Sequence, residues 1–165
     1  MEQTNYTPIE ILLVEDNEDD IILTTQALKK GKIKNNLHVA QDGVEALAFL
    51  RREGKFAAAV RPDMILSDLN MPRMNGHELL EKIKTDPLLA PIPVIILTTS
   101  RAEEDVVKTY AHHSNCFIPK PVSMEDFEKV IRTVEDFWFM IVRLPQEPSG
   151  RDAPEAAGRL RKEKQ

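Results

Sequence analysis

Met64-Ile-Leu-Ser-Asp68-Leu-Asn-Met-Pro-Arg-Met-Asn-Gly76 is a short apolar run that ends in an acid and then breaks into a loop rich in Pro, Asn and Gly. This pattern predicts a buried strand that delivers one carboxylate, Asp68, to the rim of a sheet. Open α/β sheets bind their ligands beyond the carboxyl ends of the strands. We therefore ask which other side chains reach the rim beside Asp68.

Composition limits the class of protein. The chain has 165 residues, of which 42% are hydrophobic and 30% are charged, as expected for one soluble domain, and no apolar run is long enough to span a membrane. Cys116 is the single cysteine and the N-terminus has no secretory pattern, which favours a reducing cytoplasm. The net charge of -5 argues against direct nucleic-acid binding, which usually needs a basic face.

Apolar runs alternate with amphipathic segments along the chain. Strands are predicted over residues 9–14, 37–40, 64–68, 93–98 and 116–119. Helices are predicted up to Lys30, from Asp42 to a stop at Gly54, from about Gly76 to Asp86, from Ser100 through Tyr110, and from Ser123 to about Arg143.

Strands that alternate with helices form a parallel sheet, because each right-handed crossover returns the chain to the same edge. We predict a flavodoxin-like, doubly wound α/β fold, with a five-stranded parallel sheet in the order 2-1-3-4-5 and helices on both faces. Residues 9–145 are expected to form this domain, after an N-terminal tail of residues 1–8. The segment 146–165, rich in Pro, Glu, Arg and Lys, is expected to be a disordered tail.

Three carboxylates should converge where the first and third strands end, since these strands are neighbours in the predicted order. Glu15 and Asp16 follow the first strand, and Asp68 ends the third. Acids this close repel one another unless they are protonated or bind a cation. Carboxylates with a backbone carbonyl, here that of Asn70, are ligands that suit Mg²⁺.

Two further side chains should arrive at the same rim. Thr98 ends the fourth strand, and Lys120 follows the fifth. With a metal bound, an aspartate can attack a phosphoryl group and form an acyl phosphate. Lys120 would then offer positive charge to the phosphoryl oxygens, and the Thr98 hydroxyl would offer a hydrogen bond.

Together these residues resemble the receiver domain of two-component response regulators, over about residues 9 to 142. The resemblance rests on five motifs in order at the strand ends, namely Glu15-Asp16, Asp68 with Asn70-Met-Pro, Gly76, Thr98 and Lys120-Pro121. It implies that Asp68 is the phospho-acceptor, that Glu15 and Asp16 hold Mg²⁺, and that Thr98 and Lys120 contact the phosphoryl group. Phe117 is the implied switch aromatic, at a place where the family often has Tyr.

The resemblance also implies a role and partners. A receiver catalyses only its own phosphorylation and dephosphorylation, so it is a signalling protein whose helix 4–strand 5–helix 5 face changes for a downstream protein that the sequence does not identify. Segments such as His113-Ser-Asn-Cys-Phe117 and Asp136-Phe-Trp138 are similar to small response regulators that partner phytochrome histidine kinases. A phytochrome-type kinase is therefore the expected phosphoryl donor.

Two other functions fit parts of the pattern. A pseudo-receiver would keep the fold without phosphorylation and act only as a protein-binding module. A metal-dependent phosphatase of the haloacid dehalogenase type would place its nucleophile after the first strand with a second Asp two residues later, whereas here Asp68 follows the third strand and the later position is Asn70. Exposure to Mg²⁺ and a small phosphodonor separates the phospho-accepting receiver from the pseudo-receiver.

The last predicted helix is too long for the sheet that it covers, since about twenty helical residues span about 30 Å and a five-residue strand about 17 Å. The stripe from Phe127 to Trp138 can pack in the core. The overhang leaves large apolar residues, including Phe137, Phe139, Met140, Ile141 and Leu144, which would be an unusual exposed patch on a monomer. We predict a two-fold homodimer through this patch; the alternative is that the overhang folds back on its own chain.

Overall fold

The computed structural model describes residues 7–98, 116–120 and 123–143. Its strands form one parallel sheet in the order β2-β1-β3-β4-β5, so the predicted fold class is confirmed. Along the chain the elements are β1 (Ile9–Val14), α1 (Glu18–Lys30), β2 (Asn35–Ala40), α2 (Gly43–Arg51), the short 3₁₀ helix η1 (Gly54–Phe56), β3 (Met64–Asp68), α3 (Gly76–Thr85), β4 (Val94–Thr98), β5 (Cys116–Pro119) and α5 (Met124–Arg143).

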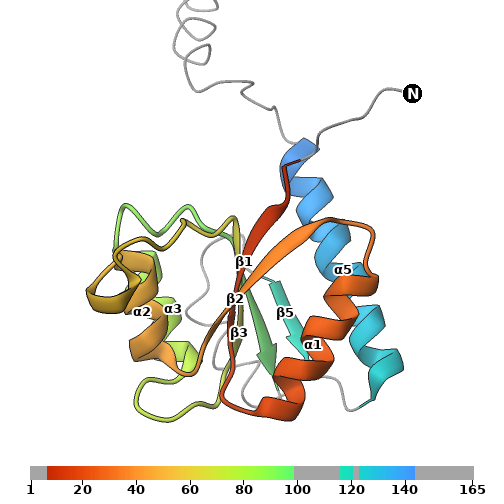
Figure 1. The fold of residues 1–165 in the computed structure, drawn as a ribbon, viewed down its shortest axis with the longest axis horizontal. Helices are drawn as coiled ribbons and strands as arrows, with labels where there is room; N and C mark the ends of the chain where they lie inside the picture. Colours follow the sequence, from red (N-terminus) through yellow and green to blue (C-terminus); the bar gives the residue numbers. More distant parts are fainter. Residues whose placement is uncertain (1–6, 99–115, 121–122, 144–165) are drawn as a thin grey trace, which may run out of the picture.

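The sheet is covered on both faces (Figure 1). One face packs against α1 and α5, and the other packs against α2 and α3. All five residues of β3 are buried, as the apolar run at Met64–Asp68 predicts. Apolar side chains therefore alternate between two separate core layers, with Ile65 in the α2–α3 layer and Leu66 in the α1–α5 layer.

Polar residues at the predicted helix starts act as caps. The side chains of Asn17, Asp42 and Asn75 each accept a hydrogen bond from a backbone N–H three residues later. Ser123 does the same for α5, where its hydroxyl oxygen accepts from the N–H of Asp126 at 3.2 Å. These bonds satisfy N–H groups that the first turn of a helix leaves unpaired, and the helix starts predicted at Asp42 and Ser123 are confirmed.

One helix end was predicted wrongly. We expected Gly54 to close α2, but the helix ends at Arg51 and Arg52 adopts the left-handed conformation, with φ at 57°. Gly54 instead begins η1. The N–H of Arg52 reaches carbonyl groups of the last helical turn, and these bonds stabilise a backbone conformation that a glycine would adopt more easily. Two strand boundaries also shift slightly, because β2 begins at Asn35 and β4 at Val94.

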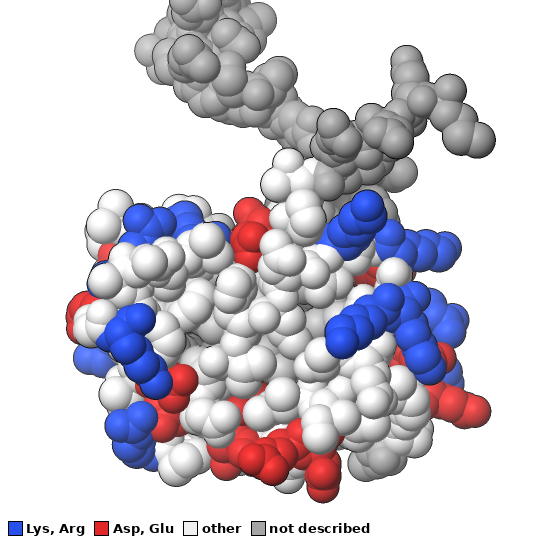
Figure 2. Space-filling model, viewed as in Figure 1, with Lys and Arg blue, Asp and Glu red and all other residues white. Residues whose placement is uncertain are grey.

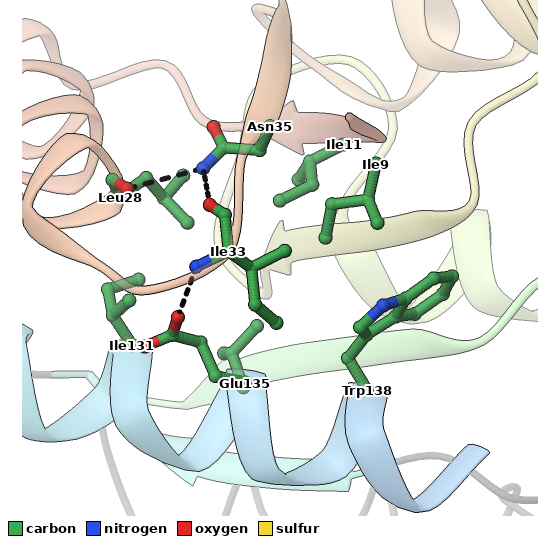
Figure 3. A pocket seen from close by; sticks show the side chains of 9 residues that line it. Ile9, Ile11, Leu28, Ile33, Asn35, Ile131, Glu135 and Trp138 are labelled. Carbon is green, nitrogen blue, oxygen red and sulfur yellow. Dashed lines mark hydrogen bonds between the residues drawn. The ribbon is translucent and has the colours of Figure 1, made fainter. Parts of the chain in front are cut away.

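The loop between α1 and β2 is held by α5 (Figure 3). Glu135 is buried on α5, and its Oε2 accepts a hydrogen bond of 2.8 Å from the N–H of Ile33. The side-chain amide of Asn35 donates to the carbonyls of Leu28 and Ile33. The buried carboxylate of Glu135 is thus paired with a backbone N–H. This bond connects α5 to the α1–β2 loop, at the edge of the sheet opposite the carboxyl ends of the strands.

Several predictions fall wholly or partly outside the described residues. These are the helix over 100–110, most of the predicted tail 1–8, the predicted tail 146–165, and the side chains of Phe137, Phe139, Met140 and Ile141, with Leu144 beyond the last described residue. The homodimer and the limits of the domain therefore stay predictions. The stripe from Phe127 to Val134 is buried as predicted, with Trp138 packed at its edge. None of the described helices is both long and apolar enough to cross a bilayer.

Candidate functional site

The register of the sheet brings the predicted site residues to one edge. Val14 is paired with Ser67, so Glu15 and Asp68 come next on neighbouring strands. Thr98 is paired with Pro119, so Lys120 leaves the sheet just beyond. In Figure 2, acidic side chains gather at the lower edge of the molecule, where the strand arrows of Figure 1 end.

Asp68 is the last residue of β3 and is only 3% exposed. Its Oδ1 accepts a hydrogen bond of 2.8 Å from the N–H of Leu69, and its Oδ2 lies 3.1 Å from the Nζ of Lys120. The backbone N–H of Asn70 also hydrogen-bonds this carboxylate. Gly76 packs against the carbonyl of Asp68 so closely that a Cβ would clash with it. Backbone N–H groups and Lys120 therefore hold the carboxylate, while Gly76 packs against the backbone of the same residue.

Glu15, Asp16 and Asp68 each place one carboxylate oxygen within 4.8 Å of the others. Glu15 is 1% exposed, and its Oε1 accepts from the N–H of Asn17 at 3.1 Å, whereas Asp16 is exposed. An all-oxygen donor set of this kind fits a hard divalent cation such as Mg²⁺. The predicted convergence of the three acids is therefore present in the structure.

Lys120 meets three carboxylates at once. Its Nζ lies 2.8 Å from Oδ2 of Asp20, 3.1 Å from Asp68 and 3.2 Å from Oε2 of Glu15. Asp20 was not singled out from the sequence, because it belongs to a run of acids, Glu18-Asp19-Asp20, that reads as ordinary charge at a helix N-terminus. The sequence signal that could have identified Asp20 was its position three residues after the helix cap Asn17. This position places Asp20 in the first turn of α1, beside the same edge of the sheet.

The charges at the site shift one another's pKa. Burial, together with the nearby charge of Asp68, raises the pKa of Glu15 to about 7 although Lys120 acts against this. Burial also raises the pKa of Asp68, and it outweighs the hydrogen bond and charge of Lys120. The pKa of Lys120 is raised as well, since its partners Asp20, Asp68 and Glu15 outweigh the cost of its own burial. Lys120 therefore stays charged, while Glu15 and Asp68 favour a proton or another cation.

Other predicted residues are only partly placed. Thr98 ends β4 and Phe117 lies within β5, as predicted, but their side chains are outside what the structure describes. Asn70 is exposed at the start of the loop after β3, and its role as a carbonyl ligand stays a prediction.

Comparison with known families decides the class of protein. The model of the response regulator receiver domain matches residues 11–132. The chain belongs to the response regulator receiver family. This receiver thus has the fold and the acid–lysine site that the family resemblance implied, and it is a two-component signalling protein by family.

The relatives of this receiver include phytochrome response regulators. Response regulator Rcp1 of Synechocystis sp. is 41% identical over 145 residues, which cover 88% of this chain and 99% of that protein. The crystal structure of the phosphorylated cyanobacterial phytochrome response regulator RcpA is similar with a TM-score of 0.75 and 41% identity, over 85% of this chain and all of that one. The Mn²⁺-bound form of Rcp1 is similar with a TM-score of 0.73 and 42% identity, over 84% of this chain and all of that one.

Proposed function

We propose that this receiver accepts a phosphoryl group from a histidine kinase on Asp68. The observation that carries the proposal is a buried carboxylate, fixed by backbone N–H groups, beside a charged lysine and two further acids. A carboxylate oxygen of Asp68 attacks the phosphorus, the phosphorus–nitrogen bond of the donor phosphohistidine breaks, and its electron pair stays on the imidazole nitrogen. The product is an acyl phosphate on Asp68.

Glu15, Asp16, Asp68 and the carbonyl of Asn70 would hold Mg²⁺. The donor set fits this ion, and the similar Rcp1 structure is a Mn²⁺-bound form. Bound there, Mg²⁺ supplies positive charge that stabilises the transferring phosphoryl oxygens. The raised pKa of Glu15 and of Asp68 supports the choice, because the effect of burial on these two acids outweighs the positive charge of Lys120 and a further cation would offset it.

Lys120 would offset the negative charge of the phosphoryl group. Its ammonium lies 3.1 Å from Asp68, within reach of a phosphoryl group on that residue, and its ion pair with Asp20 would keep it close to the site. Thr98 and Phe117 would then change position, and this would alter the face formed by β5, α5 and the segment before β5. This face would bind the downstream protein.

The experiment uses acetyl phosphate, a small acyl phosphate donor, followed by intact mass measurement. With Mg²⁺ the parent should gain one phosphoryl group that is lost on mild alkaline treatment, and with the metal chelated it should gain none. No gain under either condition would favour the pseudo-receiver, which acts only as a binding module.

A phytochrome-type histidine kinase in the cytoplasm is the proposed donor, on the strength of the similarity to RcpA and Rcp1. The test compares phosphoryl transfer to this receiver from a phytochrome kinase and from an unrelated histidine kinase under the same conditions. Faster transfer from the phytochrome kinase is expected, and equal rates would remove the assignment.

We also propose a homodimer through the end of α5, where Phe137, Phe139, Met140, Ile141 and Leu144 follow one another closely in the sequence. Sedimentation at micromolar concentration should show a dimer. The double change Phe137→Glu and Met140→Glu should give a folded monomer that is still phosphorylated. A parent that is monomeric with and without phosphodonor would exclude the dimer.

A further inference from the structure

The loop between β3 and α3 carries Asn70 and has an unusual backbone. The N–H of Met74 bonds to the carbonyl of Pro72 at 2.7 Å, which makes a γ-turn around Arg73. Arg73 has a φ of 64°. A positive φ is uncommon in a residue with a side chain, and a tight turn of this kind is strained. Such strain persists only where surrounding contacts hold it, and it often marks a functional loop.

The contacts that hold this turn come from the start of α2. The Nε of Arg73 donates to Oδ2 of Asp42 at 2.7 Å. Asp42 is 5% exposed, and its other oxygen, Oδ1, accepts from the N–H of Glu45 at 2.9 Å as the cap of α2. One buried carboxylate thus caps a helix with one oxygen and holds the loop with the other.

A second contact lies beside this ion pair. The N–H of Gly43 donates to the carbonyl of Met74 at 3.0 Å. A Cβ on Gly43 would come within 2.7 Å of both that carbonyl oxygen and the Cγ of Met74. The loop therefore rests directly on the first turn of α2, and its far end closes where the N–H of Gly76 bonds to the carbonyl of Leu69 at 2.8 Å. Asn70 lies between these two fixed points.

We propose that Asp42 and Arg73 are positioning residues, whose ion pair holds the β3–α3 loop in the conformation that presents the Asn70 carbonyl to the cation at Asp68. The inference rests on the metal site of the proposed function. A ligand binds more weakly when only a fraction of the protein has the competent loop conformation. Loosening the ion pair should therefore weaken Mg²⁺ binding without removing any metal ligand.

Asp42→Asn is the sharpest variant, because Asn caps a helix about as well as Asp but carries no charge. Arg73→Gln removes the other charge, and Arg73→Lys keeps it. We expect the dissociation constant for Mg²⁺, measured by calorimetry on the unphosphorylated protein, to rise about fivefold in Asp42→Asn and in Arg73→Gln, and less in Arg73→Lys. The double variant Asp42→Asn, Arg73→Gln should be no weaker than either single one, since both remove the same ion pair.

Lys30→Gln is the matched control, because it breaks an ion pair with Glu128 on the α1–α5 face, away from the loop. Its Mg²⁺ affinity should equal that of the parent. A purely structural role would lower the melting temperature of Asp42→Asn and Arg73→Gln while leaving Mg²⁺ affinity within twofold of the parent, and that result overturns the inference. A parent that binds no Mg²⁺ would overturn both the metal site and the positioning role. If the parent binds Mg²⁺ but takes up no phosphoryl group, the phospho-acceptor proposal fails, and the Mg²⁺ affinities of the variants still decide the positioning role.

Discussion

Buried carboxylates lie in two charged regions of this receiver, and they behave in opposite ways. At the strand ends, Glu15 and Asp68 share Lys120 with Asp20, and burial raises the pKa of both. At the start of α2, burial also acts on Asp42, but the hydrogen bond and charge of Arg73 and the backbone N–H groups of the cap outweigh it, and the pKa of Asp42 is lowered.

The difference comes from both depth and charge balance. Glu15, Asp68 and Asp42 expose similarly little surface, at 1%, 3% and 5%, but Glu15 and Asp68 lie deeper in the protein, so burial raises the pKa of these two acids more strongly. Arg73 pairs with Asp42, whereas within the described part of the chain Lys120 is divided among three acids. Asp42, which has one cation and caps a helix, stabilises the fold. The acids at the strand ends outnumber Lys120, and such a cluster favours binding of a proton or a metal ion and is typical of a functional site.

The largest expected effect is on chemistry. Asp68→Asn keeps the size and polarity of the side chain but removes the nucleophilic anion, so phosphoryl uptake should disappear while the fold survives. Intact mass after treatment with acetyl phosphate and Mg²⁺ measures this. Glu10→Gln is the matched carboxylate-to-amide control outside the site, and it should still take up one phosphoryl group. Continued uptake by Asp68→Asn would show that another residue is the acceptor.

The second effect is on the pH dependence of stability. The pKa of Glu15 is about 7 in the folded protein against an ordinary value of 4.5, so its contribution to stability is complete below pH 4.5 and is lost as the pH rises through 7. Without metal, the free energy of unfolding of the parent should fall by about 1 to 3 kcal/mol between pH 5 and 8. Chemical denaturation at each pH measures this fall.

Glu15→Gln and saturating Mg²⁺ should each flatten that profile, the first by removing the titrating group and the second by replacing its proton. Asp42→Asn is the contrasting variant, and it should leave the fall between pH 5 and 8 unchanged, because the pKa of Asp42 is lowered and the group stays ionised throughout. If the free energy of unfolding of the parent does not change from pH 5 to 8 without metal, the raised pKa of Glu15 is wrong.

A third effect reverses sign between the two regions. At pH 8 without metal, Glu15→Gln should raise the free energy of unfolding by about 1 kcal/mol, because it removes a repelled anion. Asp42→Asn should lower it by about 1 kcal/mol, because it removes a paired one. Thermal and chemical unfolding of both variants beside the parent decides this, and a loss of stability in both would place Glu15 among the structural acids.

The smallest effect concerns an acid on the sheet surface. Hydrogen bonds from Asn36 and His38 lower the pKa of Glu10, so its contribution is present above pH 4.5 and is lost as the pH falls through the folded pKa. Glu10→Gln should cost less than about 1 kcal/mol at pH 7, and the cost should vanish in acid. Denaturation curves at pH 7 and pH 3 test it; a larger cost at pH 3 would contradict the assignment.

Much of this organisation could be predicted from local sequence. Five apolar runs alternating with helices that start at residues such as Asp42 and Ser123 predicted the sheet order. Acids at the strand ends predicted the convergence of Glu15, Asp16 and Asp68. The particular partners of individual side chains could not be read in this way. Asp20 resembles any acid of a first helical turn, and the pairing of Arg73 with Asp42 joins residues 31 positions apart.

Backbone conformation was the other limit. Arg52 and Arg73 have positive φ without being Gly or Asn, so residue type does not mark these two positions. Gly54 attracted the predicted helix end in place of Arg52. In both cases hydrogen bonds made by the surrounding structure stabilise what the residue type alone disfavours.

The most direct test of the account is to locate the phosphoryl group. After treatment with acetyl phosphate and Mg²⁺, borohydride reduces an aspartyl phosphate to homoserine, and mass spectrometry of the peptides then reports the modified position. The account predicts homoserine at residue 68 and unmodified carboxylates at Glu15, Asp16 and Asp20. Reduction at any of those three acids, or none at residue 68 in a protein shown to bind Mg²⁺, would contradict it.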